Sequence, residues 1–231
     1  MTFGNTKAAL EERKAYKEND IAVSRRVYNL LIGGLLLWGF ALNFLMVKLL
    51  GEKVSEFAMN GGALPILLIY LVCVILGAVL VRRDNPVTSF IGYNLIALPV
   101  GLILCVALQG YPSSVISTAV LMTAIITAVF VVLGSIFPNL FLSIGRALGV
   151  GLIILIVGEL ITLLLFRSSR MELVWAYLGA GLFAMFIGFD WARCNVCACT
   201  VNNAIAASAN LYLDIINLFL RLLQILNKNR K

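Results

Sequence analysis

Long, almost uncharged apolar runs dominate this sequence and restrict it to one kind of environment. Each run approaches the ~20 residues that cross a hydrocarbon core about 30 Å thick as a helix. Short polar or Gly- and Pro-containing segments separate the runs, as expected for helix ends in a multi-pass protein. We predict seven spans, at about residues 27–50, 64–81, 87–108, 115–136, 144–166, 173–189 and 204–226.

The composition agrees with a lipid environment. Of the 231 residues, 61% are hydrophobic and 13% are charged, and the mean hydropathy is +1.00. A soluble domain carries roughly 25% charged residues on its wetted surface. We therefore predict an all-α integral membrane protein, a seven-transmembrane-helix bundle over residues 27–227. A polar, basic N-terminal arm at 1–26 precedes the bundle, and a basic tail at 228–231 follows it.

The net charge of +7 would suggest nucleic acid as the partner of a soluble chain. In a membrane chain, basic residues near helix ends set the orientation and contact anionic lipid headgroups. We therefore expect the lipid bilayer as a partner and no nucleic acid. A modest excess of Lys and Arg on the side of the arm predicts a cytoplasmic N-terminus. The short arm and compact length favour a bacterial inner membrane over an intracellular organelle membrane.

The sequence has no histidine, which excludes His-based metal sites and His-based catalysis. No nucleophile–base pair is visible either, so we do not expect an enzyme. Cys194, Cys197 and Cys199 form a C-x-x-C-x-C cluster before the last span, but a closed zinc site needs four ligands. We therefore predict a reduced cytoplasmic loop there, with no bound metal and no cofactor.

The last span carries a stripe of polar side chains on an otherwise apolar helix. At 100° per residue these positions fall on one face. The stripe consists of Asn203, Asn210, Asp214, Asn217, Arg221, Gln224 and Lys228. Such a face must meet protein or water rather than lipid. It is either a polar seam that joins helices or the wall of an ion or proton path, and the spacing favours neither.

Two further carboxylates lie within spans, Asp190 at the inner end of the sixth and Glu159 in the outer half of the fifth. The topology places Arg82, Asp190 and Asp214 toward one side of the membrane. Two carboxylates in one desolvated site cannot both ionise cheaply, so they would share a proton, and an arginine would favour the ionised form. This is a candidate pH switch. The simpler alternative is that Arg82 only marks the membrane boundary.

Three motifs resemble the transmembrane Bax inhibitor motif family, over roughly residues 25–227. One is the run Asn-Leu-Tyr-Leu-Asp-Ile-Ile-Asn-Leu-Phe from Asn210, another is Gly-Phe-Asp ending at Asp190, and the third is Arg82-Arg83. The resemblance favours a prokaryotic member. It implies a seven-helix fold with the last helix central, and a pH-dependent Ca²⁺ leak. It also implies an aspartate-pair gate, Asp190 and Asp214, with Arg82 as the basic partner. The chain departs from the family at Leu71, where some members carry an acid.

Together these observations predict a pH-sensitive Ca²⁺ leak channel or exchanger with Ca²⁺ and H⁺ as its ions. Carboxylate and amide oxygens suit a hard cation, which makes Asn210, Asn217 and Glu159 candidates for the ion path. The alternative is a regulatory membrane protein that acts through partner binding and transports nothing. Ion flux in protein-only liposomes separates the two.

Overall fold

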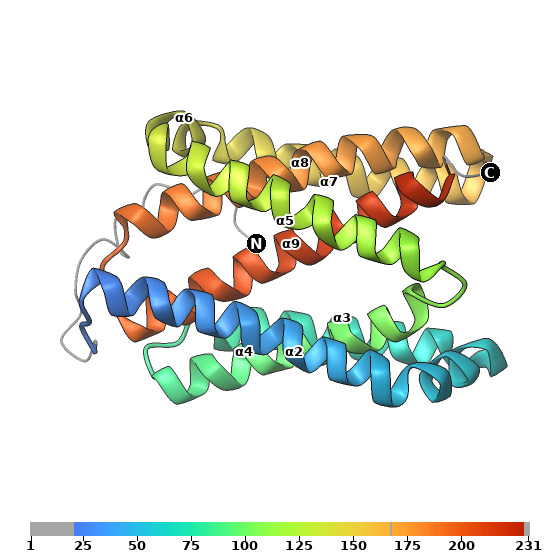
Figure 1. Cartoon of the computed structure of the whole chain (residues 1–231), viewed down its shortest axis with the longest axis horizontal. Coiled ribbons are helices and arrows are strands. Elements are labelled where there is room, and N and C mark those ends of the chain that lie inside the picture. The colour runs from blue at the N-terminus through green and yellow to red at the C-terminus, as the bar shows by residue number, and fades with distance from the viewer. Residues whose placement is uncertain (1–20, 167, 229–231) are drawn as a thin grey trace. The chain divides into compact units, whose positions relative to one another are not determined.

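A computed structural model of the chain describes residues 21–166 and 168–228. Most of the predicted arm, residues 1–20, and most of the predicted tail, residues 229–231, lie outside the described residues. Most of the described residues are helical, short turns join the helices, and the β-structure among them is one isolated bridge between Ala22 and Thr200. Its helices are α2 (Arg25–Phe57), α3 (Ala63–Leu80), α4 (Pro86–Ala107), α5 (Ser113–Ile136), α6 (Pro138–Ser143), α7 (Gly145–Ile161), α8 (Ser169–Val196) and α9 (Val201–Lys228) (Figure 1).

Six stretches of the described residues are long and apolar enough to cross a membrane, which confirms the multi-pass prediction. The first stretch, Arg25–Leu80, is 56 residues long and contains both α2 and α3. A break at Ala58–Gly62 divides it, where Asn60 and Gly61 leave helical geometry and Gly61 has φ of 98°. Glycine adopts this positive φ without the Cβ clash that other residues suffer.

Several predictions of where helices begin and end differ from the structure. Helix α8 runs from Ser169 to Val196, beyond the predicted limits of 173 and 189 at both ends, so Asp190 and Cys194 lie inside a helix rather than at its end and in the following loop. Helix α2 continues to Phe57, beyond the predicted end near residue 50, because the charged residues that follow the apolar run are good helix formers. The helix ends only near the glycine with positive φ. The short helix α6 was not predicted, and it begins at Pro138, whose fixed φ suits the first turn of a helix.

The chain divides into two compact units. The described part of the first unit comprises Tyr111–Cys197 and residues 213–228, and that of the second comprises residues 21–110 and Ala198–Tyr212. Helix α9 therefore contributes its N-terminal part to the second unit and its C-terminal part to the first.

In the second unit, α2 and α3 both pack against α4 (Figure 1). Glycines bring α3 and α4 into backbone contact: a Cβ on Gly77 would lie 2.7 Å from the Gly92 carbonyl oxygen. Small residues permit this close approach between membrane helices. The fully buried Tyr93 donates to the Leu35 carbonyl at 2.5 Å, and Asn43 Nδ2 donates to the hydroxyl of buried Tyr212.

The start of α9 is also anchored within the second unit. The Val23 amide donates to the Cys199 carbonyl at 2.8 Å, and the Val201 amide donates to the Ile21 carbonyl at 3.0 Å. The side chain of Asn202 donates to the Asp84 carbonyl, in the turn between α3 and α4. These bonds fix where the last helix begins and therefore the register of its polar stripe.

In the first unit, α5, α6 and α7 pack against α8 (Figure 1). A Cβ on Gly134 of α5 would lie 2.5 Å from the Gly188 carbonyl oxygen of α8, so the two backbones touch. Phe141 of α6 is buried against the same Gly188. This packing fixes the end of α8, and Asp190 follows two residues after the contact.

Candidate functional site

Two buried carboxylates meet in the first unit. Asp190 comes from α8 and Asp214 from α9, and their relative exposures are only 6% and 9%. The two side chains lie within hydrogen-bonding range of each other and interact as charges. Because an ionised carboxylate in a membrane helix is costly, both residues need compensating partners. The structure thus brings together the two aspartates that the sequence analysis had placed on one side of the membrane.

The basic partner of this pair within the first unit is Arg193. Its Nη2 lies 3.1 Å from Asp190 Oδ1, one helical turn further along α8. Its guanidinium also stands 5.7 Å from the centre of the Phe189 ring and interacts electrostatically with Asp214. Sequence reasoning did not assign Arg193 to the site. The available signal was its spacing of three residues from Asp190, which puts both side chains on one face of a helix.

Arg82, the predicted basic partner, lies in the second unit. It is exposed and occupies the turn after α3, where the Arg83 carbonyl accepts a bond from Ser89 at 2.9 Å. Its part in the aspartate site stays a prediction.

One oxygen of the pair has no hydrogen bond. Among the described residues, Asp214 Oδ2 is buried and has no partner. The thiols of Cys194 and Cys197 are the other titratable groups around Arg193. The site therefore combines two carboxylates with one guanidinium in a low-dielectric setting. Such a group is electroneutral when the two carboxylates share one proton, and it carries excess negative charge when they hold none.

The predicted ion-path amides lie on α9. Asn217 donates through Nδ2 to the Leu213 carbonyl at 2.8 Å and is half-buried. Asn210 is also half-buried and belongs to the part of α9 in the second unit. No described contact assigns an ion to either residue, so their role stays a prediction.

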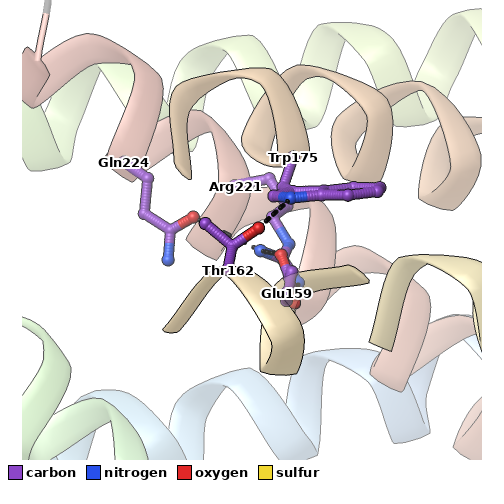
Figure 2. Close-up of polar contacts among 5 residues, drawn as sticks. All are labelled: Glu159, Thr162, Trp175, Arg221 and Gln224. Atoms are coloured by element: carbon purple, nitrogen blue, oxygen red, sulfur yellow. Dashed lines mark hydrogen bonds and ion pairs between the residues drawn. The ribbon is translucent and has the colours of Figure 1, made fainter. Parts of the chain in front are cut away.

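Glu159 does not stand alone in its span. Its carboxylate binds the Arg221 guanidinium through two nitrogens, with Arg221 Nη2 at 2.9 Å from Glu159 Oε2 (Figure 2). Beside this pair, Trp175 Nε1 donates to Thr162 Oγ1 at 2.8 Å (Figure 2). The relative exposures of the Arg221 and Glu159 side chains are 17% and 30%. Glu159 therefore faces α9, as a bidentate partner of its arginine.

A second ion pair lies nearby. Lys228 Nζ of α9 is 2.6 Å from Glu172 Oε2 of α8. Both pairs line one open pocket of about 600 Å³, together with Trp175 and apolar side chains of α7. Among the described residues, no group of three or more His, Cys, Asp or Glu is placed to hold a metal ion.

The comparisons with known proteins place the chain in a family. The family model described as "Inhibitor of apoptosis-promoting Bax1" matches residues 21–231. No curated protein matches the chain. The family match spans all the described helices, including both aspartate-bearing segments. The resemblance drawn from the sequence motifs is thus confirmed: the chain belongs to the Bax inhibitor family.

Proposed function

We propose that this protein is a pH-sensitive Ca²⁺ leak channel or exchanger, gated by Asp190 and Asp214. The observation that supports the proposal most directly is the burial of two interacting carboxylates against a single arginine, Arg193. Intramembrane acids are costly and commonly mark ion paths or proton relays. A group of two acids and one base also changes its net charge when a single proton leaves.

The same proposal includes the membrane arrangement. The stretch Arg25–Leu80 is more than twice the ~20 residues that one span needs, and its break separates α2 from α3. Two crossings there raise the number of spans to seven. The proposed arrangement also has α9 at the centre of the other helices, as the family resemblance implies. The basic arm favours a cytoplasmic N-terminus, in the inner membrane of a bacterium.

The gating step follows from charge balance. With one shared proton, the two aspartates and Arg193 are neutral together, and α9 packs against α8 without net repulsion. Loss of that proton leaves two negative carboxylates side by side, which opposes this packing. If one conformation holds the proton and the other does not, each pH unit changes their balance by about 1.36 kcal/mol. Two pH units then change the population ratio by about 100-fold.

The path for the cation would follow the polar stripe of α9. Its amides, Asn210 and Asn217, carry oxygen ligands of the kind that Ca²⁺ prefers. Glu159 would contribute at the other end of the path, where Arg221 now binds its carboxylate. A cation entering there competes with the arginine for the same oxygens.

A Ca²⁺ flux titration in protein-only liposomes tests the proposal, with wild type, Asp190→Asn and Asp214→Asn measured across pH. Both variants remove the group that shares the proton, so the pH dependence of flux should flatten. Glu52→Gln, which neutralises an exposed carboxylate of α2, is the control and should keep the wild-type profile. If both Asn variants keep it too, the pair is not the sensor. If the wild type conducts nothing, the protein acts instead by binding partners.

A further inference from the structure

The pocket of about 600 Å³ in the first unit is lined by two acid–base pairs, and the charges of its described side chains sum to zero. Its acids are Glu159 and Glu172, and its bases are Arg221 and Lys228. Each acid is bound by one base. A bare cation must displace a base from its acid, and a bare anion must displace an acid from its base. Either ligand leaves a partly buried charge without compensation. A permeating cation needs this state only briefly, but for a ligand that stays bound it is unfavourable.

A ligand that carries both charges avoids this penalty. Its anionic end can take the place of the carboxylate on the base of one pair, while its cationic end binds the carboxylate that is released. The ammonium of Lys228 is a compact cation that can bind a phosphate. The carboxylates accept only, so they bind a primary ammonium, which has three N–H donors, better than a quaternary one with none.

The position of the pocket indicates where such a ligand comes from. The helical segment ending at Phe166, the start of α8 and the end of α9 all come together around it, so it lies at the level where spans end. Its apolar wall includes Leu160 and Leu163, whose relative exposures are 52% and 62%. Trp175 and Tyr111 also line it. Tryptophan and tyrosine are enriched where the hydrocarbon meets the headgroups, and exposed leucines there contact acyl chains.

We propose that this pocket binds the headgroup of a zwitterionic phospholipid with a primary ammonium, of the phosphoethanolamine type. The phosphate binds Lys228 and the ammonium binds Glu172, the more exposed of the two pairs, and the acyl chains lie against the leucine wall. The site is distinct from the aspartate pair. Arg221 is seven residues from Asp214 along α9, which corresponds to about 10 Å of helix.

Native mass spectrometry of the purified full chain in detergent measures this binding directly. The probes are short-chain phosphatidylethanolamine, phosphatidylcholine and phosphatidylglycerol, and water-soluble phosphoethanolamine. We expect phosphatidylethanolamine to bind at least tenfold more tightly than the other two lipids. The double variant Glu172→Gln/Lys228→Gln keeps the pocket neutral and keeps the Arg221 pair, and it should lose most of this preference. Glu52→Gln/Lys53→Gln, an exposed acid and base of α2, is the matched control and should keep the preference.

The outcomes are distinguishable. Equal binding of phosphatidylglycerol and phosphatidylethanolamine means a general anion site and overturns the proposal, as does an absence of saturable binding. If phosphoethanolamine binds as tightly as the lipid, the pocket recognises the phosphate and ammonium groups as proposed. The ligand is then a water-soluble compound, and the proposed lipid is wrong. Because the measurement needs no Ca²⁺ flux, it stands or fails independently of the proposed transport.

Discussion

Arg193 Nη2 lies 3.1 Å from Asp190 Oδ1, and the two residues are about one turn apart on α8. This contact ties the charge of Asp190 to a neighbour on its own helix and leaves Asp214, on α9, as the carboxylate whose Oδ2 has no partner among the described residues. A proton shared by the pair would therefore change the interaction between α9 and α8, and not only the charge of α8. In the proposed mechanism, protonation of this pair couples the two helices, because each helix carries one of the acids.

Arg193 should control the pH at which flux changes. In Arg193→Gln, loss of the cation makes the ionised carboxylates less favourable, so the midpoint of the flux titration should move to higher pH by about one unit. Arg193→Lys keeps the charge and should shift it less. We expect Arg82→Gln to move the midpoint in the same direction but by less, because Arg82 is exposed. A larger shift for Arg82 than for Arg193 would show that Arg193 has the weaker effect on the protonation of the aspartate pair.

The Glu159–Arg221 pair should contribute to stability. Glu159→Gln leaves the guanidinium without its carboxylate, and we expect a loss of about 1–2 kcal/mol, less than a fully buried pair because both side chains are partly exposed. The double variant with Arg221→Gln should lose less than the sum of the single losses. Apparent thermal unfolding midpoints in detergent give the comparison, with Glu56→Gln as the exposed control. Strictly additive losses would contradict the pairing.

Glu159→Gln also tests the ion path. If the carboxylate receives cations, Ca²⁺ flux per folded protein should fall in liposomes, because the amide attracts the divalent cation less strongly. Normalising flux to the folded fraction separates this effect from the loss of stability. Unchanged normalised flux would leave Glu159 as a structural partner of Arg221.

The contact between α5 and α8 should not tolerate a side chain. Gly134→Ala places a methyl group 2.5 Å from the Gly188 carbonyl oxygen, and backbone atoms cannot move aside cheaply. We expect a loss of about 1–3 kcal/mol, typical of overpacking. Gly181→Ala on α8 is the matched control, since nothing lies within 4 Å of its added Cβ. Apparent unfolding midpoints should fall for the first variant only. A similar midpoint for both would mean that the helices separate easily.

The hydroxyl of Tyr212 should matter through Asn43. Tyr212→Phe removes the acceptor of the Asn43 amide, a side chain that is 3% exposed. An unmade buried hydrogen bond costs about 1–3 kcal/mol, so the unfolding midpoint should fall. Adding Asn43→Val, which removes the stranded amide, should recover part of the loss. If Tyr212→Phe is as stable as the wild type, the bond contributes little.

The positions of the helices followed closely from the sequence. Apolar runs of membrane-spanning length must be helical because lipid offers no hydrogen-bond partner to the backbone. The predicted limits of the third and fourth runs therefore lie within about two residues of the ends of α4 and α5. Those of the fifth run agree equally well with α7 and the helical segment that continues it to Phe166. The stripe of α9 likewise follows from the helical repeat alone. The family was also evident, because the residues from Asn210 to Phe219 form one continuous local motif.

The partners of the charged groups were decided by tertiary structure. The sequence indicated that Asp190, Asp214 and Glu159 need compensation, because a charge in a span is costly. It could not say which side chains supply it. Arg221 binds Glu159 across 62 residues, and only the packing of α7, α8 and α9 brings them together. Burial cost is a property of one residue and can be read along the chain, whereas the pairing that offsets it depends on the relative placement of helices.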